Sequence, residues 1–301
     1  MFKKIILAVS SVLVSLSFLF VVPAFAANDC SFTTVGTTMT LNANCTTDAT
    51  IPVPDGYTLD GNGYSITGVD PSGGHFLGAV VANGGTTAYV RNLTVTVSGL
   101  ANVCDDGADR LRGVMFDGAS GSITNNTVMN INQSSSGCQE GNAIEVRNAP
   151  FDGTHPNTQY VTVENNMITN YQKTGVVANG DVDVTVLKNT IMGVGPVNYI
   201  AQNGIQFGFG ATGNAVKNDV SGNWYTPVDW SSTGVLVYGG SNVKVVNNNI
   251  HDNEIGVDDE NDAFYGNQAD NNKIIHNTFA DNGLGYYDGG TNSKIHANVY
   301  E

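Results

Sequence analysis

The chain has 301 residues, of which 41% are hydrophobic, and its 27 acidic and 12 basic residues give a net charge of −15. This composition supplies a substantial apolar core and excludes an intrinsically disordered chain. The negative charge disfavours nucleic acid and anionic membranes as partners, and it disfavours polyanionic glycans unless a divalent cation mediates.

The first 26 residues differ from the rest. A positive start, MFKK, precedes an apolar run from Ile5 to Val22, and Ala24 to Ala26 form the small-x-small pattern of a signal peptidase site. The run is also just long enough to span a bilayer, so a membrane anchor remains an alternative. We expect residues 1–26 to be a signal peptide and residues 27–301 to form one domain, secreted or periplasmic and not inserted in the membrane.

A short asparagine-rich motif recurs along the exported chain, in stretches such as ITNNTVMN, VENNMITN and KVVNNNIHDN. One asparagine occupies the same place in each copy, and consecutive copies are 40, 23, 29, 30 and 29 residues apart. The aligned residues are Asn126, Asn166, Asn189, Asn218, Asn248 and Asn277, with weaker copies at Asn92 and Asn298. Self-similarity at this period predicts a stacked solenoid.

Each repeat also carries a short strand that opens with glycine, such as GVVANG at Gly175 and GIQFGF at Gly204. Short β-branched runs bounded by Gly, Asn and Asp predict strands and turns, and no later segment shows a sustained helical period. The repeats therefore predict an all-β, single-stranded parallel β-helix of about nine coils. We expect the aligned asparagines to lie at a bend of each coil, where their amides form a structural ladder along the axis.

The stretch DGYTLDGNGYSI at Asp55, the glycine-opened strands and the NNT-V bends resemble the right-handed parallel β-helix proteins of the pectate-lyase-like superfamily, from about Cys30 onward. That resemblance implies a right-handed helix. It does not fix an activity, because the scaffold hosts lyases, glycoside hydrolases, epimerases, esterases and non-enzymatic surface proteins. Of the polygalacturonase segments only the Asp258–Asp259 pair is present, and the pectate lyase segments are absent, so no catalytic residue is carried over.

The four cysteines are expected to be oxidised in an exported protein. Cys104 precedes the strand GVMF by nine residues and Cys138 precedes AIEV by five, so both fall in the same loop of successive repeats. Stacking of the coils then pairs Cys104 with Cys138. Cys30 and Cys45 remain to close the N-terminal end.

Long loops precede the glycine-opened strand in four coils, at residues 99–112, 132–142, 193–203 and 224–233. Long loops on a rigid scaffold commonly carry function. On the strands beside them, Asp117, Glu145 and Arg147 are outward-facing neighbours and the predicted catalytic residues. Arg147 would hold an acidic sugar group while a carboxylate acts as acid or base. The alternative is a plain cross-strand ion pair of Arg147 with Asp117.

The predicted substrate-binding residues are aromatic or amide side chains of the same region, namely Trp224, Tyr225, Trp230, Tyr238 and Gln206. Exposed aromatic faces stack on sugar rings. The alternative is that one or both tryptophans fold down over the edge of the core.

A second acidic cluster contains Asp258, Asp259, Glu260 and Asp288. Alternation along the strands points Asp259 and Asp288 inward, which requires a shared proton, a bound cation or a break in register. Oxygen ligands in an exported protein suggest calcium as the cation. The spacing fits no EF-hand, because Ala263 occupies the place of its glycine.

Two functional hypotheses remain from the sequence. The first is a secreted protein that binds, and cleaves or modifies, a polysaccharide along the central coils as a lyase, glycoside hydrolase or epimerase. The alternative is a non-enzymatic cell-surface or extracellular β-helix that serves in binding or adhesion. The stretch SKIHANVYE shows no capping element, which leaves two alternatives: self-association through the C-terminal coil, or a short terminal coil that caps the solenoid.

Overall fold

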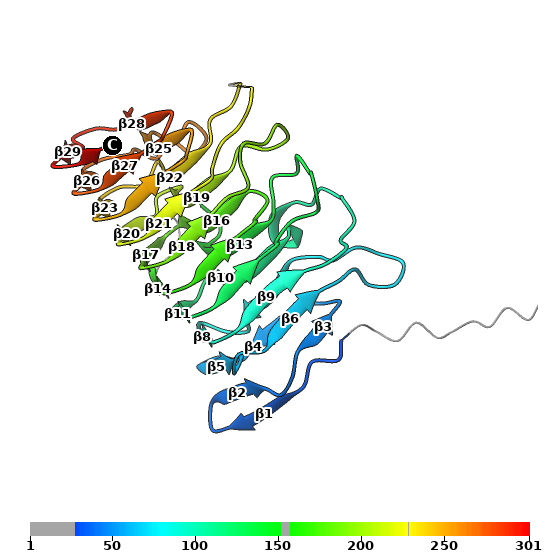
Figure 1. The fold of residues 1–301 in the computed structure, drawn as a ribbon. Coiled ribbons are helices and arrows are strands. Elements are labelled where there is room, and N and C mark those ends of the chain that lie inside the picture. Colours follow the sequence, from blue (N-terminus) through cyan, green and yellow to red (C-terminus); the bar gives the residue numbers. More distant parts are fainter. Residues whose placement is uncertain (1–27, 152–156, 228) are drawn as a thin grey trace, which may run out of the picture.

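The computed structural model describes residues 28–301, apart from 152–156 and 228, and its strands stack into three sheets that form a rod (Figure 1). The predicted signal peptide lies outside the described residues. Beyond the strands there is one short 3-10 helix in the described chain, η1 (Gly107–Asp109). No helix among the described residues is long and apolar enough to cross a membrane.

The three sheets are named A, B and C. Sheet A contains β1 (Phe32–Val35), β2 (Thr38–Leu41), β5 (Tyr57–Asp60), β8 (Thr87–Arg91), β11 (Ser120–Thr124), β14 (Gln159–Glu164), β17 (Val182–Leu187), β20 (Thr212–Val216), β23 (Lys244–Val246), β26 (Lys273–Ile275) and β29 (Lys294–His296). Sheet B contains β3 (Cys45–Thr47), β6 (Ser65–Gly68), β9 (Thr94–Val97), β12 (Thr127–Met129), β15 (Met167–Thr169), β18 (Thr190–Met192), β21 (Asp219–Ser221), β24 (Asn249–His251), β27 (Thr278–Ala280) and β30 (Val299–Tyr300). Sheet C contains β4 (Ile51–Val53), β7 (Ala79–Asn83), β10 (Arg112–Asp117), β13 (Asn142–Asn148), β16 (Thr174–Gly180), β19 (Asn203–Gly208), β22 (Thr233–Tyr238), β25 (Ile255–Glu260) and β28 (Leu284–Asp288).

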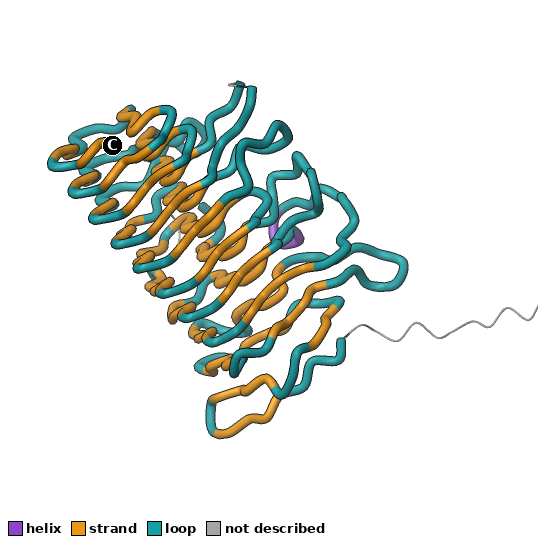
Figure 2. Tube along the Cα trace, in the orientation of Figure 1, coloured by secondary structure: helices purple, strands orange, loops and turns teal. Residues whose placement is uncertain are grey.

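Each coil runs through one strand of sheet C, one of sheet A and one of sheet B, and then returns to sheet C. The nine strands of sheet C, from β4 to β28, therefore count nine coils, as the repeats predict. All pairings between coils are parallel, and only β1 and β2 pair antiparallel. The longest loops project from one side of the stack, where sheet B returns to sheet C (Figure 2).

The core is built from alternate residues of the strands, which stack on the residue at the matched position of the next coil. On sheet C the paired residues of one inward column are all fully buried, and they are Val114, Ile144, Val176, Ile205, Val235 and Val257. Because side chains alternate across a strand, the residues between them face outward and form the surface of sheet C.

The aligned asparagines form one continuous ladder at the bend between sheets A and B. The side-chain Oδ1 of each accepts hydrogen bonds from the backbone N–H and the Nδ2 of the asparagine one coil earlier, at 2.8–3.1 Å, from Asn126 to Asn298. Each Nδ2 also donates to a backbone carbonyl, as Asn166 does to Ile123 at 2.9 Å. The predicted structural role of these asparagines is confirmed.

The alignment of Asn92 with this ladder is wrong by one residue. Leu93 occupies the ladder position, and its backbone N–H donates to Asn126 Oδ1 at 3.1 Å. Asn92 instead has the left-handed backbone of the preceding bend position, with φ of 52°, as Asn125 has with φ of 56°. The two positions are adjacent and both favour asparagine, for different reasons, so a single asparagine in VRNLTV does not reveal which one it fills.

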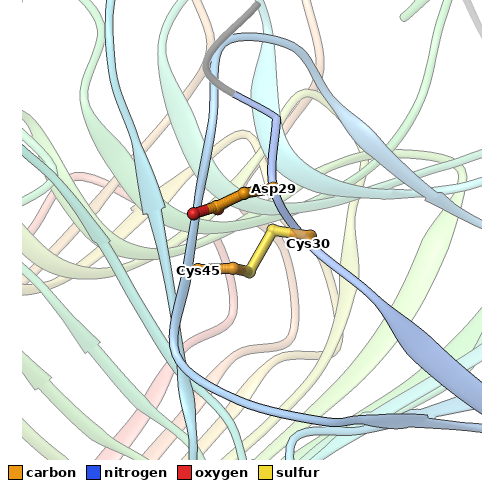
Figure 3. Close-up of side chains that lie close together, drawn as sticks. All are labelled: Asp29, Cys30 and Cys45. Atoms are coloured by element: carbon orange, nitrogen blue, oxygen red, sulfur yellow. A yellow bond between two sulfur atoms is a disulfide. The ribbon is translucent and has the colours of Figure 1, made fainter.

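Both predicted disulfides are present. Cys30 bonds to Cys45, next to Asp29, whose carboxylate accepts a hydrogen bond from the Thr46 backbone at 2.6 Å (Figure 3). Cys104 bonds to Cys138 across two successive long loops. The stacking argument therefore chose the correct pairing.

Candidate functional site

A cleft of about 410 Å³ lies on the outward face of sheet C. It crosses β10, β13, β16, β19, β22 and β25 and is bordered by the loops that the repeats identified as long. Its lining residues are Gly107, Arg110, Arg112, Gln139, Asn142, Glu145, Arg147, Phe151, Lys173, Thr174, Val177, Asn179, Asn203, Gln206, Phe209, Leu236, Tyr238 and Glu260. The floor of the cleft is made by outward-facing side chains of sheet C, which the parallel register aligns in rows across neighbouring strands.

Glu145 lies in the floor as one half of a buried ion pair. Arg112 Nε donates to its Oε2, and Asn142 Nδ2 donates to the same oxygen at 3.0 Å. Burial alone would raise the pKa of Glu145, but the charge and hydrogen bond of Arg112, with Asn142 and Arg147, hold the pKa below its ordinary value. Glu145 is therefore a carboxylate at neutral pH. Sequence reasoning missed Arg112, which it treated as the last residue of a loop.

Asp117 and Arg147 are paired across neighbouring strands, at matched positions of β10 and β13. Both Nε and a terminal nitrogen of Arg147 donate to Asp117 Oδ2, at 2.9 and 2.7 Å. Arg147 lines the cleft and is 8% exposed, whereas Asp117 does not line it. The structure therefore places the three predicted catalytic residues side by side, with the ion pair of Arg147 and Asp117 formed.

Lys173 forms part of the cleft wall, immediately before β16. Its Nζ donates to the backbone carbonyl of Ala201 at 2.6 Å. Burial lowers the pKa of Lys173 to about 8. At pH 7 about a tenth of this amine is therefore neutral. In the sequence Lys173 is only a lone lysine before a glycine-opened strand, because its lowered pKa depends on how the neighbouring loops pack.

The cleft gathers several of the few basic residues of an acidic protein, and each of its arginines has a carboxylate partner: Asp106 for Arg110, Glu145 for Arg112 and Asp117 for Arg147. Lys3 and Lys4 are the only charged residues of the first 26, so 10 basic residues remain against 27 acids. Four of those ten line the cleft, namely Arg110, Arg112, Arg147 and Lys173, and its lining acids are Glu145 and Glu260. Fields of exposed charges are screened within roughly 8–10 Å. The net charge of the chain therefore does not by itself describe the distribution of charge on this surface.

Two buried polar atoms of the lining lack any hydrogen bond to a described residue. They are Asn142 Oδ1 and Thr174 Oγ1. Buried polar groups are normally paired, because each unpaired one costs about 1–3 kcal/mol.

Aromatic side chains close one end of the cleft. The rings of Phe151 and Phe209 stack with centroids 5.4 Å apart, and Tyr238 and Tyr265 pack edge-on against Phe209 at 5.6 and 5.5 Å. Tyr238 and the predicted Gln206 both line the cleft, and Gln206 Nε2 donates to Asn179 at 3.1 Å. Phe151 and Phe209 were missed because they lie in bends after the strands, which short-range patterns do not orient.

The predicted aromatic loop divides between two places. Tyr225 and Trp230 line a second cavity beside the cleft, and Trp230 is 70% exposed. Trp224 lines neither cavity: its ring passes Gly283 so closely that a Cβ there would lie 3.3 Å from it. The alternative that one tryptophan packs down onto the coils thus applies to Trp224 and not to Trp230.

The four predicted calcium ligands do not converge. Asp259 faces inward and accepts hydrogen bonds from Asn272 at 2.9 Å and Ser293 at 2.8 Å, whereas its register partner Asp288 is exposed. Asp258 faces the other side of β25. No three of their oxygen atoms lie within 4.8 Å of one another in the described chain, so this residue set does not fit a calcium cage.

Asp258 is itself unusual. It is 7% exposed, and its Oδ1 has no hydrogen-bond partner among the described residues. Burial, followed by the charges of Glu260 and Asp259, raises the pKa of Asp258 to about 7. This carboxyl group is therefore partly protonated at neutral pH.

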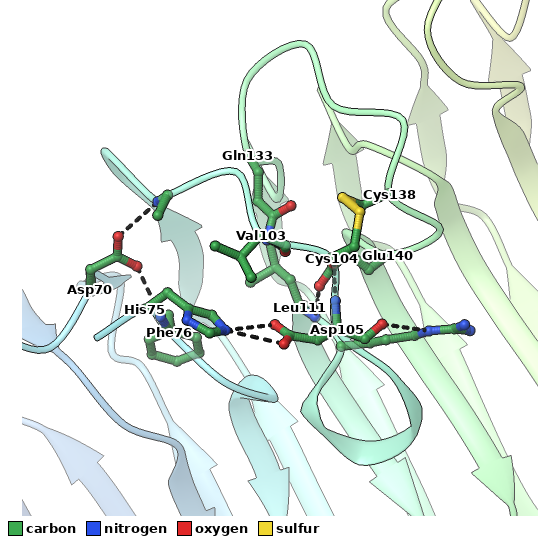
Figure 4. Close-up of polar contacts among 12 residues, drawn as sticks. Asp70, His75, Phe76, Val103, Cys104, Asp105, Leu111, Gln133, Cys138 and Glu140 are labelled. Carbon is green, nitrogen blue, oxygen red and sulfur yellow. Dashed lines mark hydrogen bonds and ion pairs between the residues drawn. A yellow bond between two sulfur atoms is a disulfide. The ribbon is translucent and has the colours of Figure 1, made fainter. Parts of the chain in front are cut away.

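The loop that carries Arg110 is fixed by a polar network around the second disulfide (Figure 4). The buried Glu140 accepts hydrogen bonds from the backbone N–H groups of Asp105 at 3.1 Å and Leu111 at 2.7 Å. The Asp105 carboxylate contacts His75 at 3.1 Å, and its carbonyl accepts a bond from Arg110 at 3.2 Å. These contacts hold the rim of the cleft in place beside Arg112.

The comparisons with known proteins identify the fold of the chain and do not assign it an activity. No curated protein sequence matches the chain. Among solved structures, the Dettilon tailspike protein is 15% identical, with a TM-score of 0.42 over 87% of this chain and 61% of that one. The enzymatically active domain of bacteriophage CBA120 tailspike protein 2 is 12% identical, with a TM-score of 0.44 over 88% and 39%. The periplasmic alginate epimerase AlgG is 11% identical, with a TM-score of 0.36 over 90% and 80%.

The chain thus spans less than two thirds of either tailspike chain. Residues 112–300, more than half of the sequence, match the family described as the right handed beta helix region. This match confirms the predicted architecture and its handedness. The chain belongs to the right-handed β-helix family.

Proposed function

We propose that this protein binds an acidic polysaccharide in the cleft of sheet C and modifies it outside the cytoplasm, as a lyase or epimerase that removes the proton next to a sugar carboxylate. The observation that carries the proposal is that Arg147, which uses three of its five donors, and Lys173 line the same cleft. A carboxylate-bearing sugar supplies the negative charge that such a cleft attracts.

Arg147 is the ligand for the sugar carboxylate in this proposal. Its guanidinium makes three hydrogen bonds, to Asp117 and to the Gly107 carbonyl, out of the five that it can donate. Arg112 makes four, to Glu145 and to backbone carbonyls. Asp117 and Glu145 then act by orienting the two guanidinium groups.

Lys173 is the general base. Its neutral amine accepts the proton from the carbon next to the carboxylate, and the electron pair left on that carbon spreads into the carboxylate, where Arg147 stabilises the charge. Return of a proton from water to the opposite face gives an epimer, and loss of the neighbouring glycosidic oxygen, which takes up a proton from the Lys173 ammonium or from water, gives an unsaturated product. Glu145 is not the protonated acid that glycoside hydrolysis needs, because its lowered pKa keeps that group ionised.

The test uses polymers of galacturonate, mannuronate and guluronate with the mature protein. We expect at least one to bind, and Arg147→Gln to weaken that binding at least tenfold. Lys173→Ala should retain binding while abolishing both the unsaturated product and the incorporation of deuterium from heavy water. Lys244→Ala, on the far sheet A, is the matched control and should change neither.

Two outcomes decide against parts of the proposal. If no acidic polymer binds, or if Arg147→Gln binds as well as the unaltered protein, the cleft is not the binding site. If binding depends on Arg147 but no polymer is altered, the protein is a non-enzymatic binding β-helix, which is the alternative that the sequence left open.

A further inference from the structure

A second cavity of about 400 Å³ opens beside the cleft, and we name it the side pocket. It lies among the long loops that precede β13, β19 and β22, and Lys173 belongs to the short loop of the intervening coil, before β16. Its lining residues are Gly137, Gln139, Lys173, Tyr199, Ile200, Ala201, Tyr225 and Trp230. Gln139 and Lys173 also line the cleft, so one wall separates the two cavities.

The loops that form the side pocket are bonded to one another. The Val197 backbone donates to the Trp224 carbonyl at 3.0 Å, and the Thr226 backbone donates back to Val197 at 2.9 Å. Lys173 Nζ donates to the Ala201 carbonyl in the same loop as Val197, and the Lys173 backbone N–H donates to the Gly141 carbonyl, at the end of the loop before β13, at 3.2 Å. The pocket is therefore formed in the absence of a ligand.

Its chemistry contrasts with that of the cleft. Among the described residues that line it there is no arginine, aspartate or glutamate, and Lys173 is the single charged one. Tyr199, Tyr225 and Trp230 give it three aromatic faces. The hydroxyl groups of Tyr199 and Tyr225 make no hydrogen bond with a described residue, and Gln139 is exposed beside them.

We propose that the side pocket binds a neutral sugar ring, carried as a branch on the acidic chain in the cleft. The apolar face of a pyranose stacks on Trp230 or a tyrosine ring, while its hydroxyl groups bond the free phenol groups and Gln139. A carboxylate in the side pocket would have only Lys173 as a positively charged partner among the lining residues. The inference rests on the proposed function for the acidic chain, and it narrows the substrate to an acidic polysaccharide with neutral branches, with the branch point next to Lys173.

The side pocket can be tested without any acidic polymer. Saturation-transfer NMR with the methyl glycosides of galactose, glucose, xylose and rhamnose should detect binding of at least one. Trp230→Ala should weaken that binding about tenfold or more, while Arg147→Gln in the cleft should leave it unchanged. Trp224→Phe is the matched control, because Trp224 lies outside the pocket. If no glycoside binds, or if Trp230→Ala binds as tightly as the unaltered protein, the inference is wrong.

A second experiment tests whether one branched polymer occupies both cavities. Polygalacturonate and xylogalacturonan, which carries neutral xylose branches, are compared for affinity. We expect the branched polymer to bind more tightly, and Trp230→Ala to remove that preference while leaving the linear polymer unaffected. Equal affinities in the unaltered protein would overturn the branch assignment. Loss of all binding in Arg147→Gln concerns the proposed function of the cleft, so the two failures are distinguishable.

Discussion

The two ends of each sheet B strand are built in opposite ways. At the bend between sheets A and B, one asparagine per coil is fully hydrogen-bonded to the next, from Asn126 to Asn298. Where sheet B returns to sheet C, the loops differ from coil to coil and leave Asn142 and Thr174 with unpaired polar atoms. A repeated, saturated corner holds the coils in register, which allows the other corner to vary and form a site.

The largest effect should come from interrupting the ladder. Asn189→Ala removes the acceptor for two donors of Asn166 and leaves the Val163 carbonyl without its side-chain donor, all in a buried position. Each unpaired buried group costs about 1–3 kcal/mol, so we expect a loss of about 4 kcal/mol in the free energy of unfolding. Urea denaturation measures it. Asn214→Ala, outward on sheet A, should cost less than about 0.5 kcal/mol; equal midpoints for the two variants would contradict the role of the ladder.

The stability of the protein should also depend on the buried ion pair of Arg112 and Glu145 in the floor of the cleft. Glu145→Ala leaves the buried Arg112 guanidinium without its carboxylate, and breaking a buried ion pair typically costs about 3 kcal/mol or more. Arg112→Leu combined with Glu145→Leu removes both charges and should recover much of that loss. A double-mutant cycle in urea tests this, and an additive result would show that the two residues do not stabilise each other.

Removing the charge of Asp258 should stabilise the folded protein, whereas the substitutions above destabilise it. Its raised pKa means that the folded state holds a proton more tightly than the unfolded state, so its contribution to stability is complete below about pH 4 and is lost as the pH rises through about 7. Asp258→Asn should therefore stabilise the protein by about 2 kcal/mol at pH 8 and change little at pH 4. Thermal unfolding at the two pH values measures the difference, and a shift of equal size at both would refute the buried, protonated carboxyl.

The smallest expected effect is the pH dependence of deuterium incorporation, which Lys173 should determine. If its neutral amine is the base, deuterium incorporation should rise about tenfold per pH unit below a pH of about 8 and level off above it. Lys173→Arg keeps the charge but cannot lose its proton, so it should bind without exchange. A rate that is flat from pH 6 to pH 9 would exclude Lys173 as the base.

The architecture could be predicted from the sequence because each coil repeats the same local requirements. The aligned asparagines, the glycine-opened strands and the equivalent loop positions of Cys104 and Cys138 all appear as spacing. The single error, at Asn92, arose where two adjacent positions favour the same residue type. Repetition thus identifies the corner that is the same in every coil.

The site was only partly predictable, because its parts occur once. Arg147, Gln206 and Tyr238 were found from alternation along strands that the repeats had already located. Arg112 and Lys173 lie at the first residue of a strand and just before one, where alternation does not assign a direction. The charge of the cleft was hidden by the net charge of the chain, since four basic residues from distant segments meet only after folding.

The account depends most on the claim that the cleft selects its ligand by carboxylate charge. Calorimetric titration with an oligogalacturonate, and with the same oligosaccharide after reduction of its carboxyl groups to alcohols, tests it directly. We predict binding of the acidic form that weakens with salt and with Arg147→Gln, and a loss of at least tenfold on reduction. Equal binding of the two forms would contradict the account.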